Sequence, residues 1–380
     1  MNTYVIPTLP LHYELETKPI LKQLNEANKQ LAELKGYALT IPNENILLNS
    51  LILQEAKDSS EVENIVTTHD ELYKADLNMK DYIMSASTKE VLNYKEAMLT
   101  GFKTVRKTKL ITNKTIKTIQ ETLEGNKAGF RTITGTMLKN SKDQVVYTPP
   151  QDSETIETTM SNLEQYINNP SLSDVDPLIK MAVIHHQFES IHPFYDGNGR
   201  TGRIISILYL VQNNLLDLPI LYLSRYITMH KSEYYRLLQL IRDCKNDTEC
   251  EKAWQEWILF NLKGVENTAK NTILMVKGIQ ELMAQYKNIL RPLFGKQYKH
   301  ELLNNLFFHP YTKIEYIERD MQVQRISATK YLNMIIDEGL LNKVKVGRVN
   351  YYMNTMLIDF FINFNESIEK VDSIESVSTV

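Results

Sequence analysis

The sequence contains little cysteine and carries little net charge. Its 380 residues include only two cysteines, Cys244 and Cys250, and neither has a histidine or a further cysteine at metal-ligand spacing. We therefore expect no zinc site and no disulfide framework, and we interpret both residues as free thiols in a reducing compartment. The formal net charge of -3 excludes a global attraction to nucleic acid or anionic lipid, so any phosphate-binding site must be local.

Long hydrophobic runs and a secretion signal are also missing. No apolar stretch reaches the roughly 18 residues that a membrane-spanning helix needs. The first residues, MNTYVIPTLP, lack the charged and apolar regions of a signal peptide. These absences predict a cytoplasmic protein with no membrane partner, long enough for two or three packed units.

Apolar residues recur at helical spacing through most of the chain, which predicts a mainly α fold. The first hundred residues follow this pattern, and so do residues 152–192, where Met181, Ile184 and Phe188 form one stripe. The segment 200–216 is apolar nearly all round, which indicates a central helix. Residues 131–147 are the exception, because β-branched residues flank a polar stretch there and predict a hairpin.

The C-terminal part predicts a small second domain. Helices around 302–308, 314–321 and 327–338 precede a short hairpin, which is the order of a winged helix-turn-helix. We divide the chain into an N-terminal helical region (1–100), a core (101–275), a linker helix (276–297), the winged helix (298–356) and a tail (357–380).

The segment 192–203 reads HPFYDGNGRTGR and gathers groups suited to phosphate chemistry. Gly197 and Gly199 allow backbone N–H groups to turn inward, which forms an anion site at the start of the next helix. Arg200 and Arg203 are three positions apart, so both guanidinium groups can reach anionic oxygens near that helix end.

Two further side chains complete this segment. Asp196 would repel a bare polyphosphate unless a hard cation bridges them, so the sequence implies magnesium held by this carboxylate and by substrate phosphates. His192 has an ordinary pKa close to neutrality and can take a proton from an attacking hydroxyl. A purely structural turn would not explain this combination of residues.

HPFYDGNGRTGR resembles the signature of the Fic (Fic/DOC) family, HPFx[D/E]GN[G/K]RxxR, at every fixed position. The resemblance extends over about 10–269 and includes IPNENILLNSLILQEA (41–56), FRT (130–132) and LSRYI (223–227). It implies a Fic-type helical bundle and transfer of AMP from ATP to a Ser, Thr or Tyr hydroxyl of a target protein or of the chain itself, with release of pyrophosphate.

The resemblance also implies a role for each matching residue. His192 is the base and Asp196 holds magnesium. The residues expected to bind ATP are Asp196, Gly197, Asn198, Gly199, Arg200, Thr201, Gly202, Arg203, Tyr234 and Tyr235. Of the two tyrosines, Tyr235 is the stronger candidate for the adenosine. The run CKNDTECEK after Asp243 is an insertion relative to similar family members, so the shape of that loop stays open.

The hairpin at 130–148 resembles the family flap, which pairs with an extended target segment by strand addition. The residues expected to bind the target are Thr134, Gly135, Thr136 and Met137. An ordinary surface hairpin is the alternative interpretation.

Residues 59–64, SSEVEN, fit the family's inhibitory pattern [S/T]xxxE[G/N], with Ser59, Glu63 and Asn64 at the matching places. Glu63 would pair with Arg203 and so occupy the guanidinium that the ATP γ-phosphate needs. The alternatives are a solvated glutamate on a helix surface and a family member that removes AMP instead of adding it.

Two rival functions remain. The winged helix is also compatible with a DNA-binding regulator whose recognition helix lies near 325–331, although acidic and basic side chains nearly balance over residues 301–352. Docking of a protein target or formation of a homodimer fits the same domain. The second rival function is transfer of another nucleotide or of phosphocholine, which related family members perform.

Overall fold

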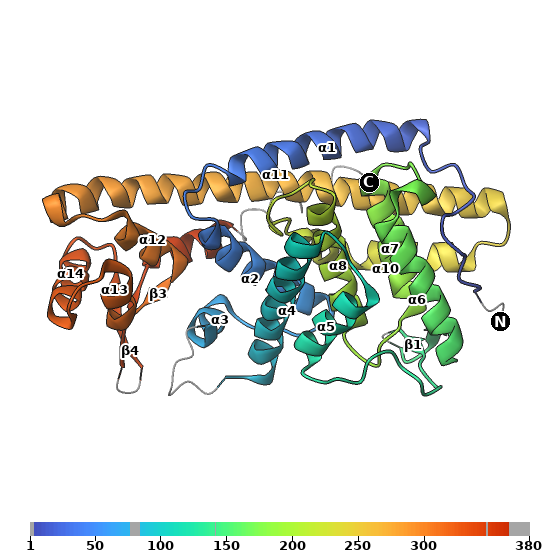
Figure 1. The fold of residues 1–380 in the computed structure, drawn as a ribbon, viewed down its shortest axis with the longest axis horizontal. Coiled ribbons are helices and arrows are strands. Elements are labelled where there is room, and N and C mark those ends of the chain that lie inside the picture. Colours follow the sequence, from blue (N-terminus) through green and yellow to red (C-terminus); the bar gives the residue numbers. More distant parts are fainter. Residues whose placement is uncertain (1–3, 77–83, 141, 347–348, 365–380) are drawn as a thin grey trace. The chain divides into compact units, whose positions relative to one another are not determined.

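The computed structural model describes residues 4–76, 84–140, 142–346 and 349–364, and its mainly helical fold confirms the prediction (Figure 1). Among these residues, no helix has both the length and the apolar character needed to cross a membrane. The α-helices are α1 (Lys18–Ala38), α2 (Glu44–Val62), α3 (His69–Asp76), α4 (Ala86–Thr108), α5 (Asn113–Glu124), α6 (Ser153–Asn168), α7 (Pro177–Ile191), α8 (Asn198–Gln212), α9 (Leu223–Met229), α10 (Lys231–Asp243), α11 (Asp247–Phe294), α12 (His300–Phe308), α13 (Ile314–Met321) and α14 (Arg325–Asp337).

The chain forms two compact units whose segments alternate along the sequence. Unit 1 comprises residues 1–35, 51–66 and 90–270, and unit 2 comprises residues 36–50, 67–89 and 271–380. The first hundred residues are thus divided between both units. The domain limits expected from the sequence remain a prediction.

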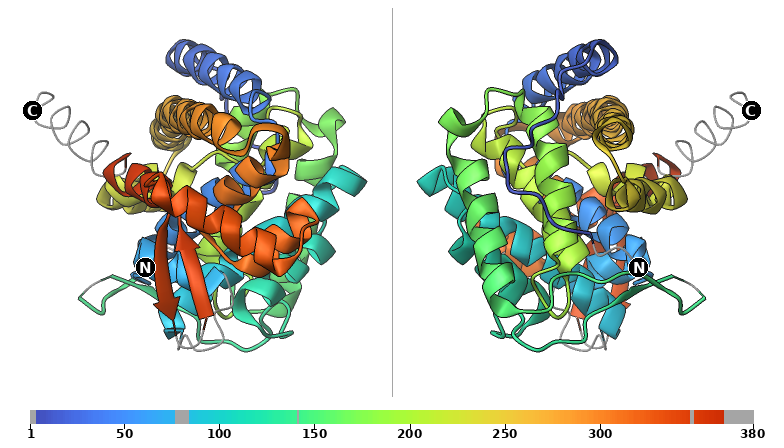
Figure 2. Two further views of the ribbon diagram at one scale, coloured as in Figure 1. Left: turned by 90° about the vertical axis from the view of Figure 1, so that its left-hand side faces the viewer. Right: turned by 90° about the vertical axis from the view of Figure 1, so that its right-hand side faces the viewer.

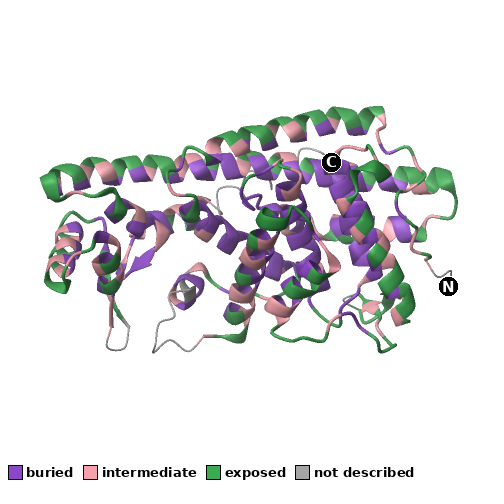
Figure 3. Cartoon of the chain, viewed as in Figure 1, coloured by how far each residue is buried: buried purple, intermediate pink, exposed green. Residues whose placement is uncertain are grey.

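The core of unit 1 is built around α7 and α8, which are buried along almost their whole length (Figure 3). Met181, Ile184 and Phe188 are buried as predicted, but so are their neighbours on every side of α7. Trp257 anchors α11 to this core by donating its indole N–H to the Ala182 carbonyl at 2.8 Å. The first part of α1 lies along α11, as both views show (Figures 1 and 2).

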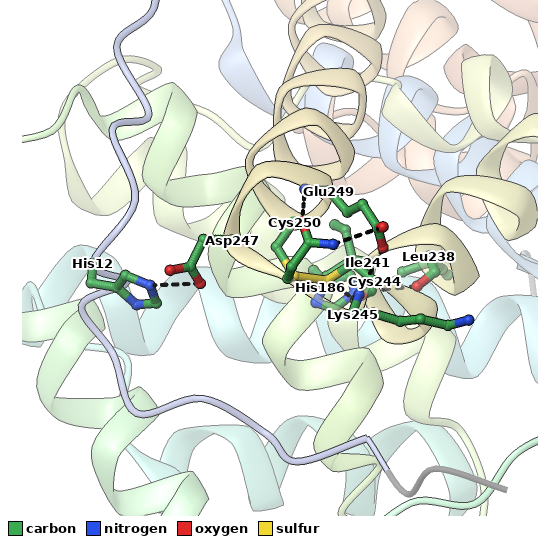
Figure 4. The surroundings of a disulfide bond; sticks show 10 residues. His12, His186, Leu238, Ile241, Cys244, Lys245, Asp247, Glu249 and Cys250 are labelled. Atoms are coloured by element: carbon green, nitrogen blue, oxygen red, sulfur yellow. Dashed lines mark hydrogen bonds and ion pairs between the residues drawn. A yellow bond between two sulfur atoms is a disulfide. The ribbon is translucent and has the colours of Figure 1, made fainter.

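The connection from α10 to α11 corrects the cysteine prediction. Cys244 and Cys250 are joined by a disulfide, with 5.2 Å between their Cα atoms, rather than being free thiols (Figure 4). The loop between them is compact, because the Glu249 carboxylate accepts hydrogen bonds from the Lys245 N–H and the Asn246 amide. Sequence spacing could not show this closure, since the two cysteines approach only because the chain turns between two helices.

The structure also corrects the extent of the predicted hairpin. Strand pairing is limited to β1 (Leu138–Lys139) and β2 (Val145–Tyr147), with an irregular register between them. Residues 131–137 form no strand. One cause lies in Gly135, whose φ of 107° interrupts the extended backbone.

Unit 2 contains the predicted C-terminal elements in the predicted order. α12, α13 and α14 are followed by β4 (Asn342–Val346) and β5 (Val349–Met353), and β3 (Tyr311–Thr312) completes an antiparallel sheet in the order β3-β5-β4. This is the arrangement of helices and wing hairpin expected for a winged helix-turn-helix. The Tyr286 hydroxyl in α11 donates to the Leu340 carbonyl and so ties that helix to the domain.

Two stretches near the expected domain limits are helical. The residues of the expected linker helix at 276–297 belong to α11 as far as Phe294. Residues 355–364, which include the start of the expected tail, are also helical and bury Leu357, Ile358 and Phe361. The rest of the predicted tail, 365–380, lies outside the described residues.

Candidate functional site

His192 is placed by the abrupt end of α7. Its backbone is left-handed, with φ 50°, and its N–H donates to the Phe188 carbonyl at 2.9 Å, which closes the last turn. The buried side chain of Arg131 holds the next peptide, because its Nε donates to the His192 carbonyl at 2.8 Å. The Arg131 N–H donates to the Pro193 carbonyl at 2.8 Å. These contacts fix the backbone that carries the imidazole at the start of the loop.

The surroundings of His192 keep its imidazole neutral. Burial lowers the pKa of His192 to about 4, and the positive charges of Arg242 and Arg131 add to this effect, whereas Glu63 opposes it. At neutral pH the ring therefore has a free nitrogen that can accept a proton.

The loop after His192 is held by one asparagine. Asn198 is buried, and its side chain accepts a hydrogen bond from the Phe194 N–H at 2.9 Å and donates to the Phe194 carbonyl at 2.8 Å. Both polar ends of this amide are therefore occupied within the loop. Asp196 is exposed, and its carboxylate accepts the Gly197 N–H at 2.7 Å. Gly197 has φ 76° and precedes the first turn of α8.

Arg203 on α8 makes the ion pair that was expected from the sequence. Its side chain is almost fully buried and donates to a Glu63 carboxylate oxygen at 2.8 Å. Two further bonds, each of 2.8 Å, go from the same guanidinium to the side chain and the carbonyl of Ser59. Arg203 therefore makes three hydrogen bonds, from Nε and Nη2, to the end of α2 and the turn after it.

Glu63 also lies against the first turn of α8. A Cβ at Gly199 would overlap its Oε1, so the carboxylate and the helix backbone meet closely only because residue 199 is glycine. Burial alone would raise the pKa of Glu63, but the positive charges of Arg203, Arg200 and Lys231 together outweigh burial, so the pKa lies below its ordinary value. Asn64 follows with φ 64° and accepts a hydrogen bond from Lys231 at 2.9 Å. A carboxylate thus occupies the end of α8 where an anion is expected.

Arg200 is not placed as the sequence suggested. Its side chain, 4% exposed, is paired with Glu90 of α4 at 3.0 Å and with Glu124 of α5 at 2.9 Å. The two arginines of the segment therefore point to different partners, and only Arg203 shares a carboxylate with the first turn of α8.

The remaining nucleotide candidates separate into buried and exposed residues. Gly202 and Thr201 are buried where α8 packs on α7. Tyr234 is 2% exposed, and its hydroxyl lies 2.8 Å from a ring nitrogen of His185, which makes it part of the core. Tyr235 is 45% exposed and lies next to it on α10. Of the two tyrosines, only Tyr235 has a surface to offer a ligand.

The flap candidates lie before β1 and are largely exposed. Thr134, Gly135 and Met137 are exposed and Thr136 is half-buried. Gln151 binds the Gly135 N–H at 2.7 Å and the Thr136 carbonyl at 3.0 Å, so these two backbone groups are already used.

Several charged residues around the site have no role that was predicted from the sequence. Arg131 lies within the FRT segment, which was noted only as part of a resemblance. Arg242 is buried and lies 4.0 Å from the centre of the Tyr147 ring, and its charge acts on His192. Glu90 and Glu124 come from helices whose periodic pattern gave no sign of a partner on α8.

Three stretches of the chain match models of one family. Residues 21–103 match the Fic/DOC family N-terminal model, and residues 110–210 match the Fic/DOC family model. Residues 282–357 match the C-terminal domain of the SoFic-like protein adenylyltransferases.

Individual relatives match over shorter stretches. A probable protein adenylyltransferase of Aquifex aeolicus is 44% identical over 54 residues, which is 14% of this chain and 17% of the relative. The protein adenylyltransferase fic-1 of Caenorhabditis elegans is 30% identical over 64 residues, 17% of this chain and 13% of that protein. The alignments therefore span less than a fifth of these relatives.

Solved structures share the fold at low sequence identity. A Fic family protein from Desulfovibrio desulfuricans has a TM-score of 0.55 at 16% identity, over 90% of this chain and 97% of that one. Fic-1 of Caenorhabditis elegans has a TM-score of 0.51 at 17% identity, over 68% and 73%. This likeness shows the fold alone, whereas the matches to the three family models show that the chain belongs to the Fic/DOC family.

Proposed function

We propose that this chain is a protein adenylyltransferase, which transfers AMP from ATP to a Ser, Thr or Tyr hydroxyl of a target protein or of itself. The observation that carries the proposal is a neutral imidazole, His192, in the loop that leads into a helix end occupied by the carboxylate of Glu63. Relatives named protein adenylyltransferases support the same reaction.

In the proposed reaction, the oxygen of the target hydroxyl attacks the α-phosphorus of ATP. The hydroxyl proton passes to the free nitrogen of His192, and the bond from the α-phosphorus to the oxygen that bridges to the β-phosphorus breaks. The products are an AMP ester on the target and pyrophosphate. The contacts of Arg131 orient the imidazole for this step by fixing the backbone on both sides of it.

The phosphates fit the first turn of α8 and the guanidinium of Arg203, because both are oriented toward an anion in this structure. Asp196 is an exposed carboxylate beside this helix end and fits a magnesium ion shared with the phosphates. When bound, magnesium would neutralise charge that develops on the phosphate oxygens. The exposed ring of Tyr235 fits the adenine base.

We further propose that Glu63 inhibits the reaction. The ATP γ-phosphate and the Glu63 carboxylate have the same charge and compete for Arg203. While Glu63 holds this guanidinium, ATP binds without its distal phosphate in place. The largely exposed residues Thr134 to Met137 are the proposed docking segment for the target.

A DNA-binding regulator is the less supported alternative. Arg325, which opens the proposed recognition helix α14, is paired with Glu315 at 2.9 Å and with Glu318 at 3.5 Å. These acidic partners reduce the positive charge that a helix needs at the DNA phosphates. We therefore assign the winged helix to protein contacts, and a homodimer is one of these.

The test is incubation of the purified chain with ATP labelled at the α-phosphate, with magnesium and with cell lysate. Mass spectrometry should find protein adducts with the mass of one AMP group, and His192→Ala should abolish them. Transfer of label that persists in His192→Ala, or adducts of another mass, would refute the assignment of this base or of this donor.

A further inference from the structure

We propose that Arg200 does not bind the nucleotide and instead ties the loop at residues 194–200, the proposed anion-binding loop, to α4 and α5. Glu124 is the positioning residue for that loop. This inference rests on the proposed function, because it concerns the loop that would hold the phosphates. It departs from the role that the sequence resemblance gave to Arg200.

The first support is the environment of the guanidinium. Arg200 has two acidic partners on two different helices, Glu90 and Glu124, at 3.0 Å and 2.9 Å. Its side chain is 4% exposed, so these are charge-assisted bonds at the inner edge of the site rather than transient surface pairs. Arg203, in contrast, has a single acidic partner, which comes from the proposed inhibitory segment.

The second support is the position of Glu124 at the last residue of α5. Its carboxylate packs directly on Gly197, and a Cβ there would overlap Oε1 of Glu124. One turn earlier on α5, the Gln120 amide donates to the Asp196 carbonyl at 3.3 Å. The end of α5 therefore contacts the loop at three residues, which are Asp196, Gly197 and Arg200.

The third support is electrostatic. Burial raises the pKa of Glu124, Arg200 lowers it, and the neighbouring carboxylates of Asp196 and Glu90 raise it again. If Arg200 moved to a phosphate, Glu124 would be left 13% exposed beside other carboxylates and close to an incoming polyanion. The ion pairs of Arg200 therefore prevent repulsion of the nucleotide by these carboxylates without any direct contact to it.

A double-mutant cycle distinguishes an Arg200 that holds the loop to α4 and α5 from an Arg200 that binds phosphate. Arg200→Met, Glu124→Gln and the double variant are made in full-length chains that carry Glu63→Gln, and Glu121→Gln on the outer side of α5 is the matched control. For each chain, kcat and KM for AMP transfer, the Kd of ATP by calorimetry and the amide hydrogen exchange of residues 194–200 are measured.

We expect each single variant to lower kcat by roughly tenfold or more, to change the Kd of ATP by less than about threefold, and to speed exchange in the loop. The double variant should be no worse than either single one, because both remove the same tie. Arg200→Lys, which keeps a positive charge for the two carboxylates, should restore part of the loop protection.

The opposite pattern would overturn the proposal. A direct phosphate ligand requires Arg200→Met to weaken ATP binding by roughly tenfold or more, and Glu124→Gln to leave it unchanged or strengthen it by freeing the guanidinium. Should the parent chain transfer no AMP, the proposed function fails. Calorimetry and hydrogen exchange would still decide the role of Arg200, and unchanged exchange in both single variants would refute the tie.

Discussion

Replacement of Glu63 by glutamine is the sharpest perturbation that this site offers. The side chain keeps its length and shape but loses the charge that pairs with Arg203 at 2.8 Å. The pKa of Glu63 lies below its ordinary value because the charges of Arg203, Arg200 and Lys231 together outweigh burial, so the carboxylate is ionised at neutral pH. Its stabilising contribution is therefore complete above the ordinary pKa of a glutamate and is lost only as the pH falls through the lowered one.

The size of the effect follows from the contact. A hydrogen bond to a charged group contributes about 1.5 to 3 kcal/mol, and a carboxylate at a helix N-terminus adds about 0.5 kcal/mol. The Glu63 side chain is 35% exposed, so solvent screens part of this sum, and we take about 2 kcal/mol. Because ATP must displace this contact to place its γ-phosphate, its removal should raise the rate of transfer about 30-fold.

The assay is incorporation of label from α-labelled ATP at pH 7.5, into the chain itself and into proteins of a lysate. Glu61→Gln is the matched control, since Glu61 lies two residues earlier and its carboxylate pairs with Lys57 at 3.3 Å. We expect no change in the control. We also expect ATP to raise the Tm of Glu63→Gln more than that of the parent chain, because ATP no longer replaces an internal ion pair.

Two results would refute this reasoning. A transfer rate in Glu63→Gln within about threefold of the parent would show that the pair does not limit the reaction, given the 30-fold expected from about 2 kcal/mol. An equal rise in the control would show that any loss of charge near the end of α2 activates the chain.

Three further predictions follow. Since the pKa of His192 is lowered to about 4, transfer should stay constant from pH 8 to about 5 and fall only toward pH 4, where the base takes up a proton; a midpoint near 6.5 would contradict this. Tyr235→Ala should raise the KM for ATP several-fold at an unchanged Tm, whereas Tyr234→Phe should lower the Tm through loss of a buried hydrogen bond of about 1 to 3 kcal/mol; the reverse pattern would exchange their roles. Replacement of Cys244 and Cys250 by serine should reduce the free energy of unfolding by about 2 kcal/mol, because the disulfide restricts only a short loop; equal stability in urea would argue against the bond.

The sequence predicted the fold well where one local signal determined the structure. Pro193 and the glycines after it ended one buried helix and opened the next, so the place of His192 between them followed from local chemistry. The hairpin at 131–147 was overestimated, because β-branched residues predict extended backbone but not the partner strand that makes it a sheet. The disulfide was missed for a related reason, since the approach of Cys244 to Cys250 depends on the turn between two helices.

The site was predictable only in part. The pairing of Glu63 with Arg203 could be expected, because a loose motif and the family signature together named both partners. For Arg200, spacing on the helix predicted a place beside Arg203 but could not show that Glu90 and Glu124 pair with it. Residues that act through long-range contacts leave no periodic trace in a single sequence.

The anchoring of α2 limits how inhibition by Glu63 could be relieved. Glu55 is fully buried, accepts the Ser224 N–H at 3.0 Å and accepts the Tyr94 hydroxyl at 3.1 Å, and so joins α2 to α9 and α4. Ser59 adds two bonds to Arg203 that do not involve Glu63. Withdrawal of the whole helix would break these buried hydrogen bonds. It would also separate the Glu55 carboxyl group from its partners on α9 and α4. Rotation of the partly exposed Glu63 side chain, at the turn where α2 has already ended, breaks one ion pair and leaves the core intact. Relief of the proposed inhibition would therefore require only movement in the turn after Val62, and α2 could remain in place while ATP took over Arg203.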